Sequence, residues 1–441
     1  MTGVSRRKFL KTTGAGALAA SSGGLAGILA TGRAPAYAQQ TTVHWLRWND
    51  FVPACDTLLR QKLLPEAEKA LGIKVRYETV NGNDLQPRIT SGIQSGAGPD
   101  LIMLFNNHPH LYQASLADMS DVADEIGKAQ GGWYKLCSAN SSSGGKYFSM
   151  PMALIGAMNA YRKSWFAEAG YNEFPKTWDQ YRDVGKKLKA KGYPIGQSFG
   201  QSFGDPPTFA YPLLWSFGGA EIDDKGKVVI NSKATVDAVK WMASAWTESF
   251  DEGGLAWDDA SNNRAFLAGT ICSTLNGASI YIESMRKPEQ YKTADGKPLK
   301  DDILHAPLPG GPAGQFGFHT YTSHVMPSYS KNQQATKDLL RFIHKKENYD
   351  QWFTTGLGFY TPGTTSWETH DLWKKDPVMA PYAVAGKQGL TPGHPGEPNA
   401  KAAEVLTKYL IGNMFAGAIR GQKAEEAVAA CEAQLKKIYE G

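Results

Sequence analysis

The chain has 441 residues, with 47 basic and 42 acidic side chains and a formal net charge of +5. Its first 38 residues hold five basic groups and no acidic group, so the other 403 residues balance 42 basic against 42 acidic groups. We therefore expect no basic surface for nucleic acid or anionic lipid. The length and the 42% of hydrophobic residues exclude a single small domain and a disordered chain.

Residues 1–38 have the pattern of an export signal. The run S-R-R-K-F-L-K at residues 5–11 precedes 21 uncharged residues, and the small-residue pattern A-Y-A ends at Ala38. Adjacent arginines, an apolar stretch and a cleavage site in this order indicate a twin-arginine signal peptide. A membrane anchor is the alternative, but the many glycines and serines disfavour insertion. We expect a periplasmic protein cleaved near Ala38.

The cysteines give no cofactor motif. None is in C-x-x-C spacing, which argues against a zinc ribbon or a thiol redox site. An oxidising compartment permits disulfides, and four cysteines allow three pairings. The sequence does not choose between these pairings and buried free thiols for Cys55, Cys137, Cys272 and Cys431.

Strands and helices alternate in the first part of the mature chain. Strands are predicted over 43–48, 73–80 and 100–105, and helices over 55–71 and 85–95. Gly72 is placed to end the first helix as a C-cap. Residues 100–105 form a nearly continuous apolar run, as in a strand covered on both faces. This alternation predicts a parallel α/β sheet.

The later elements continue the α/β pattern. Residues 138–145 read as a Ser/Gly loop, residues 147–161 as extended chain, and Thr177 as a helix N-cap. Strands are predicted over 269–275 and 321–326, and helices over 163–170, 178–190, 234–249, 336–346, 400–416 and 423–439.

Extended chain near Pro151 and again near Pro307 joins two α/β blocks. Repeated crossing between two blocks is typical of a hinge, with a ligand cleft between the lobes. We expect the first lobe at 39–150 and 310–356, and the second at 151–309 and 357–441.

Catalytic signatures are missing from the sequence. It contains no H-E-x-x-H, G-x-S-x-G or Walker A motif, and its paired carboxylates lie in apparent turns. His108-Pro109-His110 is a weak metal pattern, because no third ligand is near. We expect no catalytic residue, no metal and no cofactor.

Aromatic and amide side chains recur at the ends of predicted strands. Trp48-Asn49-Asp50 and Asn106-Asn107-His108 each follow a strand, and similar places hold Tyr211, Trp215, Asn276, Tyr321 and Tyr360. Rings stack on the aliphatic faces of a sugar, while amides and carboxylates bind its hydroxyls. Core packing is the alternative for each residue taken singly. The hypothesis of a sugar-binding site therefore depends on the recurrence of these residues at successive strand ends.

Several motifs occur in the order seen in family 1 extracellular solute-binding proteins of ABC importers. They are W-L-R-W-N-D at 45–50, G-A-G-P-D-L-I at 96–102, F-P-K-T-W-D-Q at 174–180, F-L-A-G-T at 266–270 and M-P-S-Y-S-K-N at 326–332. The chain resembles the maltose-binding-protein-like, carbohydrate-binding members of this family over nearly its whole mature length. The resemblance implies a type II periplasmic-binding-protein fold, with two α/β lobes, a hinge and a cleft.

The resemblance also assigns site residues by motif. It adds Phe209, Ser279, His394 and Glu397 to the residues above. The sequence departs from the family at Ala278-Ser279, where a tryptophan is common after Asn-Gly, and at 319–322, where Gly-Gly-Trp is frequent. The expected ligand-binding set is Trp48, Asn49, Asp50, Asn106, Asn107, His108, Phe209, Tyr211, Trp215, Asn276, Ser279, Tyr321, Tyr360, His394 and Glu397.

The resemblance implies a receptor that closes on a sugar, oligosaccharide or polyol and delivers it to membrane permease subunits. We expect a monomer. Two alternatives stay open: the same fold with a polyamine, iron or an aromatic acid as ligand, and a secreted enzyme.

Overall fold

The first lobe is built on a six-stranded mixed sheet with the order β11-β6-β10-β3-β1-β2. In this computed structural model, which describes residues 41–441, β1 pairs in parallel with β2 and β3, as the sequence predicts. Strand β10 runs antiparallel between β3 and β6, and β11 closes the edge antiparallel to β6. The export signal expected over residues 1–38 lies outside the described residues.

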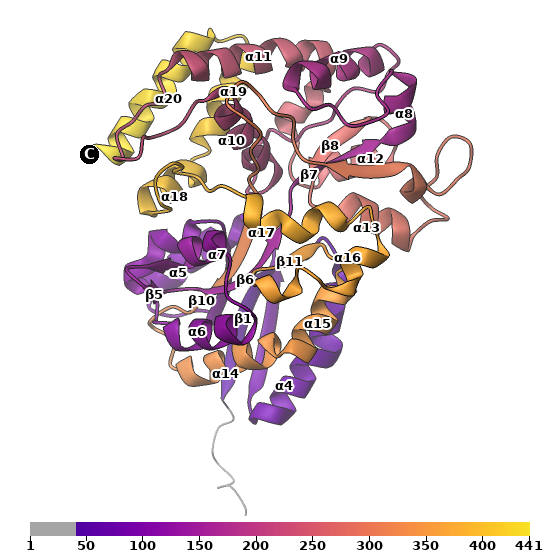
Figure 1. The fold of residues 1–441 in the computed structure, drawn as a ribbon. Helices are drawn as coiled ribbons and strands as arrows, with labels where there is room; N and C mark the ends of the chain where they lie inside the picture. The colour runs from indigo at the N-terminus through magenta and orange to yellow at the C-terminus, as the bar shows by residue number, and fades with distance from the viewer. Residues whose placement is uncertain (1–40) are drawn as a thin grey trace, which may run out of the picture. The chain divides into compact units, whose positions relative to one another are not determined.

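The elements around this sheet come from two stretches of chain, residues 42–155 and 320–388 (Figure 1). They are β1 (Thr42–Trp48), α3 (Pro53–Leu58), η1 (Leu59–Leu63), α4 (Leu64–Leu71), β2 (Lys74–Val80), η2 (Gly82–Asp84), α5 (Leu85–Ser95), β3 (Leu101–Phe105), η3 (His108–Ser115), α6 (Ser120–Ala129), α7 (Lys135–Ser141), β4 (Ser142–Ser143), β5 (Lys146–Tyr147), β6 (Met150–Ile155), β10 (Thr320–Val325), α14 (Gln333–His344), α15 (Lys346–Thr355), β11 (Tyr360–Pro362), η6 (Thr365–Trp367), α16 (Asp371–Lys375), η7 (Ala380–Val384) and α17 (Ala385–Gln388).

The second lobe surrounds a three-stranded antiparallel sheet with the order β8-β7-β9. Its elements are β7 (Met158–Arg162), α8 (Lys163–Glu168), α9 (Trp178–Lys189), α10 (Asp205–Phe217), α11 (Lys233–Ser249), η4 (Glu252–Ala256), α12 (Ser261–Leu267), β8 (Ser273–Asn276), α13 (Ser279–Arg286), η5 (Leu299–Asp302), β9 (Ile303–Ala306), α18 (Ala400–Thr407), α19 (Leu410–Ile419) and α20 (Ala424–Tyr439).

The lobe boundaries differ from those expected from the sequence. Strands β6 and β11 pair within the first sheet, although both fall in the stretches expected for the second lobe. Residues 310–314 fall in the stretch expected for the first lobe, yet Gly310 and Ala313 make backbone hydrogen bonds to second-lobe residues at the start of α9 and the end of α10. The expected crossing near Pro151 lies at Gly156–Ala157 instead, because Pro151 is inside β6.

Three crossings join the lobes: residues 156–157 after β6, residues 307–319 between β9 and β10, and residues 389–399 between α17 and α18. They lie against one another. The Leu390 amide donates to the carbonyl of Gly317 at 2.9 Å, and the Ala157 amide donates to Nδ1 of His319 at 3.0 Å. This group of crossings is the hinge.

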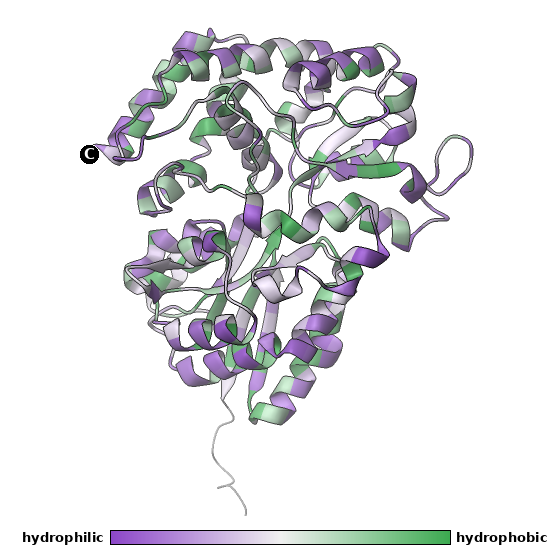
Figure 2. Cartoon of the chain, viewed as in Figure 1, coloured by the Kyte–Doolittle hydropathy of each residue, from purple (hydrophilic) through white to green (hydrophobic). Residues whose placement is uncertain are grey.

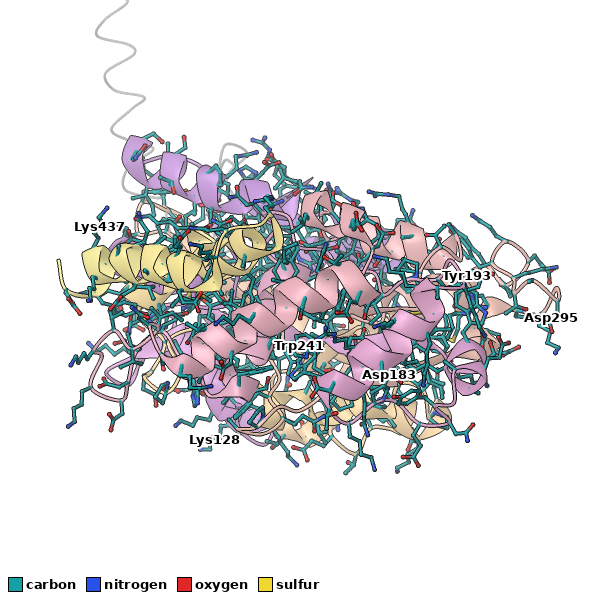
Figure 3. All side chains as sticks on the ribbon, turned by 90° about the horizontal axis from the view of Figure 1, so that it is seen from above. Lys128, Asp183, Tyr193, Trp241, Asp295 and Lys437 are labelled. Carbon is teal, nitrogen blue, oxygen red and sulfur yellow. The ribbon has the colours of Figure 1, made fainter. Side chains whose placement is uncertain are left out.

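One buried apolar cluster belongs mainly to the second lobe, and the other fills the first lobe and continues into second-lobe residues such as Phe266 and Ile280. Colouring by hydropathy shows apolar residues on the strands and on the inner faces of the helices, with polar residues outward (Figure 2). Seen from above, α11 crosses the second lobe beside α9, and the Trp241 indole donates to Asp179 at 2.9 Å (Figure 3). Trp178, the first residue of α9, is buried, and its ring lies 5.4 Å from that of Trp241.

Two further features concern export and redox state. Between residues 41 and 441 no helix is long and apolar enough to cross a membrane. All four cysteines are buried free thiols, which answers the question that the sequence left open.

Candidate functional site

The first-lobe side of the site lies where two parallel strands end. Because β1 and β3 run in parallel, Trp48 and Phe105 reach the same edge of the sheet. Asn106 follows with a φ of 49°, and its Oδ1 accepts from the Tyr321 amide at 2.9 Å. Nδ2 of Asn106 and both polar atoms of the Asn107 side chain are buried and have no hydrogen-bond partner among residues 41–441.

An aromatic cluster spans the two lobes at this edge. The ring of Phe203, from the loop before α10, stacks on Phe105 with centroids 4.1 Å apart and an interplanar angle of 14°. The Phe203 ring also contacts Trp48 in a T-shaped arrangement, with the ring centroids 5.7 Å apart. Gly82 permits this approach, since a Cβ there would lie 2.2 Å from Cε1 of Phe203. A residue from each lobe therefore contributes to one apolar platform.

The second lobe adds two carboxylates near the start of α10, of which Asp259 is buried and Asp205 is partly buried. Asp259 accepts from the Asp205 amide at 2.7 Å and from the hydroxyl of Ser202. Asp205 accepts from Nδ2 of Asn262 at 2.5 Å. Burial raises the pKa of Asp259 to about 6, while burial and then the charge of Asp259 raise the pKa of Asp205 well above its usual value.

Tyr382 lies between these groups and the hinge. Its ring packs on Gly156, where a Cβ would lie 2.6 Å from Cδ1, and its buried hydroxyl has no partner in the described chain. Burial raises the pKa of this phenol, and the nearby charge of Asp205 raises it further. Tyr382 of the first lobe therefore lies within electrostatic range of Asp205 of the second.

Other contacts hold the lobes together around this region. Helix α18 packs on η3, and Nε2 of Gln86 donates to the hydroxyl of Thr407 at 3.1 Å. An exposed ion pair joins Lys135 to Glu397 at 3.3 Å. The two lobes are thus in direct contact around this region.

We call Trp48, Phe105, Asn107, Phe203, Asp205 and Tyr382 the interlobe site. Its rings can stack on C–H faces, and its amide, hydroxyl and carboxylate can pair with hydroxyl or amino groups. Buried polar atoms without partners are costly, so a ligand that pairs with them recovers that cost. The arrangement suits binding of a polar solute.

The structure brings only some of the expected site residues to this place. Trp48 contacts Phe105 and Phe203, and Asn106, Asn107 and a buried His108 directly follow Phe105; burial lowers the pKa of His108 to about 4. Asp50 and Tyr360 lie behind Trp48 and bond to each other at 2.6 Å. Asn276 and Ser279 bond to each other at the start of α13.

The other expected residues lie elsewhere. Phe209, Tyr211 and Trp215 point into the core of the second lobe, because α10 turns these positions inward. Tyr321 is buried in the first lobe against the hydroxyl of Ser141. Asn49 is exposed.

His394 and Glu397 line a separate cavity of about 220 Å³ between α7 and the third crossing. His394 is half-buried, with its ring 5.8 Å from Trp215. Glu397 is mostly exposed in its ion pair with Lys135.

Sequence reasoning missed Phe105, Phe203, Asp205 and Tyr382. Asp205 had a usable signal, because Asp-Pro-Pro at 205–207 is typical of a helix start and places a carboxylate in its first turn. Phe203 and Tyr382 lie in irregular or short elements with no local pattern that marks them.

Comparison with known proteins identifies the family. A model of the bacterial extracellular solute-binding proteins matches residues 56–350. The chain belongs to this family. A probable ABC transporter-binding protein of Deinococcus radiodurans is 26% identical over 216 residues, 46% of this chain and 49% of the relative. The diacetylchitobiose binding protein DasA of Streptomyces coelicolor is 27% identical over 135 residues, 29% of this chain and 31% of the relative.

These matches span about half or less of the curated relatives' length, whereas the structural likeness extends further. Maltose-bound MalE3 of T. maritima aligns with a TM-score of 0.76 at 21% identity, covering 90% of this chain and 100% of that one. A ribitol-bound solute-binding protein of Agrobacterium radiobacter K84 gives 0.73 at 18% identity, covering 90% and 99%. The expected two-lobe α/β fold of this solute-binding protein is confirmed.

Proposed function

We propose that this solute-binding protein is the periplasmic receptor of an ABC importer. It binds a sugar, oligosaccharide or polyol in the interlobe site, closes about the hinge and delivers the solute to membrane permease subunits. Closure shifts the population toward the form in which both lobes contact the solute. This is binding without catalysis.

The single observation that supports this proposal is the pairing of an aromatic platform with unpartnered polar groups between the lobes. Trp48, Phe105 and Phe203 supply the platform, while Asn107 and Tyr382 present buried polar atoms without partners among the described residues. A neutral polyhydroxylated molecule has both kinds of surface. The named ligands of relatives, maltose, ribitol and diacetylchitobiose, have the same chemistry.

A ligand screen tests the proposal. Thermal unfolding is measured with maltose, laminaribiose, tagatose, ribitol and diacetylchitobiose, and positives are titrated by calorimetry. A solute at 100 times its dissociation constant adds about 2.7 kcal/mol to stability. Trp48→Ala should weaken binding of the positive compound without unfolding the protein. Stabilisation by none of these compounds, nor by related sugars and polyols, would contradict a carbohydrate receptor.

The second candidate function is binding of a solute with an amino group. The position of the Asp205 carboxylate favours it. The partly buried Asp205 carboxylate lies near the unpartnered hydroxyl of Tyr382, where a cationic or amino group would offset its desolvation. Spermidine and glucosamine in the same screen separate the candidates. Stabilisation by these amines alone, lost in Asp205→Asn, would favour the amine.

Export and oligomeric state are part of the same proposal. The twin-arginine pattern at residues 6–7 supports transport into the periplasm, with cleavage near Ala38. Replacing both arginines by lysine should retain the protein in the cytoplasmic fraction, and light scattering of the mature protein should give the mass of a monomer. A periplasmic double variant would contradict the twin-arginine route.

A further inference from the structure

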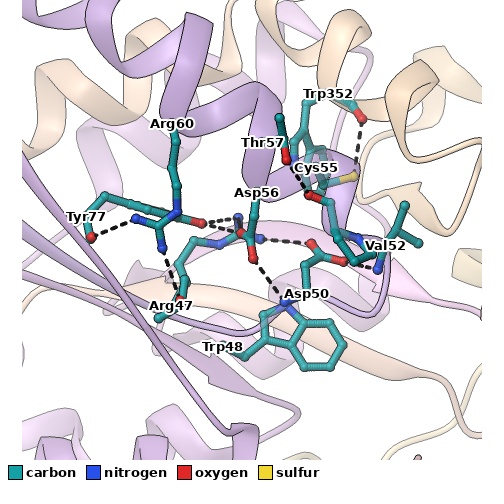
Figure 4. A network of polar contacts seen from close by, with 12 residues as sticks. Arg47, Trp48, Asp50, Val52, Cys55, Asp56, Thr57, Arg60, Tyr77 and Trp352 are labelled. Carbon is teal, nitrogen blue, oxygen red and sulfur yellow. Dashed lines mark hydrogen bonds and ion pairs between the residues drawn. The ribbon is translucent and has the colours of Figure 1, made fainter.

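A buried charged network lies behind Trp48 (Figure 4). At its centre is Arg47, which is fully buried at the end of β1, with its guanidinium 5.6 Å from the ring of Trp45 and 5.9 Å from that of Trp352. It donates to the Tyr77 hydroxyl at 3.1 Å and lies 3.8 Å from Asp56. A buried cation needs such partners to remain in the fold.

Asp50 connects this cation to the next group. Its Oδ2 lies 4.0 Å from Nη2 of Arg47, and its side chain has no exposed surface. Its Oδ1 accepts from the Val52 amide at 2.8 Å, and its Oδ2 accepts from the Tyr360 hydroxyl at 2.6 Å. Both carboxylate oxygens are therefore occupied within the protein.

Tyr360 connects Asp50 to Trp48. Its ring stacks on Trp352 with centroids 4.2 Å apart, and its hydroxyl accepts from Nε1 of Trp48 at 3.0 Å. Burial, followed by the charge of Asp50, raises the pKa of this phenol well above its usual value, so the hydroxyl keeps its proton.

The order of donors and acceptors along this chain is fixed. An ionised carboxylate only accepts, so the single proton of the Tyr360 hydroxyl points toward Asp50. The lone pairs of that oxygen are then left for the indole N–H of Trp48, which only donates. An asparagine side chain at position 50 could instead donate its N–H to the Tyr360 oxygen. The proton of the Tyr360 hydroxyl would then face an N–H group and would lose its acceptor.

We propose that Asp50 and Tyr360 are positioning residues that orient the Trp48 ring in the interlobe site and do not contact the solute. This rests on the proposed function, because it takes Trp48 as a solute contact. It departs from the motif resemblance, which assigns Asp50 to the ligand. The buried oxygens of Asp50 and the shared hydroxyl of Tyr360 leave no free group for a solute.

The first test needs no solute. The protein is labelled with ¹⁵N-tryptophan, and Trp48→Phe identifies the indole N–H resonance of Trp48. Tyr360→Phe removes only the acceptor, so that resonance should move upfield, and Asp50→Asn should move it too. The matched control is Tyr349→Phe, whose hydroxyl donates to the Met152 carbonyl at 2.6 Å outside the network. An unmoved Trp48 resonance in both test variants would overturn the proposal.

The second test uses calorimetry with whichever of maltose, laminaribiose, tagatose and ribitol binds the unaltered protein. Tyr360→Phe should weaken binding about twofold to tenfold, the range for one hydrogen bond. In a Trp48→Phe background, which has no indole N–H, the same change should have no further effect. An equal loss in both backgrounds would mean that Tyr360 contacts the solute and would overturn the proposal. If none of these compounds binds, the result contradicts the proposed carbohydrate ligand. The resonance test still decides whether Asp50 and Tyr360 orient the Trp48 ring.

Discussion

Asn107 is buried with both side-chain polar atoms unpartnered among residues 41–441, which costs the empty protein free energy. Asn107→Ala should therefore leave the unfolding free energy unchanged or raise it, while lowering the affinity for the bound solute by about tenfold or more. Urea unfolding and calorimetry measure the two effects.

The matched control is Asn348→Ala. Asn348 is also buried, but its Nδ2 donates to the Phe342 carbonyl at 2.8 Å, far from the site in sequence. This variant should lose stability and keep its affinity. Weaker binding in Asn348→Ala, or normal binding in Asn107→Ala, would contradict the assignment of Asn107.

Asp50 gives a pH prediction. Burial raises its pKa from 3.8 to about 6, so between these values the folded protein holds a proton that the unfolded chain releases. Asp50 therefore favours folding most at low pH, and this contribution is lost as the pH rises through 6. The ion-paired network needs the ionised form, so the indole resonance of Trp48 should titrate near pH 6, in the same range in which the contribution of Asp50 to stability is lost.

The groups that face Asp50 are Arg47 on β1, Cys55 and Asp56 on α3 and Tyr360 on β11, with Tyr77 on β2 reached through Arg47. Arg47 opposes the effect of burial on the pKa of Asp50. Asp50→Asn should abolish the titration of the Trp48 resonance. A titration that persists in this variant would assign the effect to another group.

The sequence located Trp48, Asn107 and Asp50 at strand ends but did not distinguish their directions. A residue at a strand end faces either the cleft or its own lobe, and here the choice depends on a distant partner. Tyr360 is 310 residues from Asp50 and draws its carboxylate away from the lobe interface. Local patterns contain no information about such a partner.

At the scale of elements, α9 has a complete capping box. The hydroxyl of Thr177 accepts from the Gln180 amide, and the Gln180 side chain accepts from the Thr177 amide, each at 3.3 Å. Thr177→Ala should lower the unfolding free energy by about 1 kcal/mol in urea. The control Thr247→Ala, at an exposed position inside α11, should cost nothing, because alanine is the better helix former. Equal losses in both variants would contradict a capping effect.

Most helices and strands agree with the sequence pattern, including α5 over Leu85–Ser95 and the Gly72 cap, whose φ is 67°. Two do not. The predicted Ser/Gly loop begins inside α7, because Leu136 and Cys137 are buried and Asn140 bonds back to the Leu136 carbonyl. The predicted helix over 400–416 breaks at Tyr409, whose φ of 54° allows α18 and α19 to change direction. Tertiary packing overrides local propensity in both places.

At the scale of the whole molecule, His319 connects the crossings of the hinge. Its Nδ1 accepts from the Ala157 amide at 3.0 Å, and burial lowers its pKa to about 4, which keeps the ring neutral and able to accept. Gly389 packs closely on the ring, since a Cβ there would lie 3.0 Å from Cδ2. A cavity of about 390 Å³ adjoins the same ring.

His319→Ala should loosen the hinge, because it leaves the Ala157 amide without its acceptor and removes the ring on which the third crossing packs. Small-angle scattering of the solute-free variant should give a larger radius of gyration than the unaltered protein. His370→Ala, on the first lobe and bonded to Asp350, is the control and should not change it. Identical scattering from all three proteins would show that His319 does not hold the hinge.

A central strand of the first sheet, β10, is made after the whole of the second sheet. Until residue 325 has been made, β10 is absent, and the first sheet remains divided into β1, β2 and β3 on one side and β6 on the other. The three strands of the second sheet are all made by residue 306. The sheet that starts the sequence is therefore completed after the sheet that follows it, and its folding waits for pairings of long sequence separation.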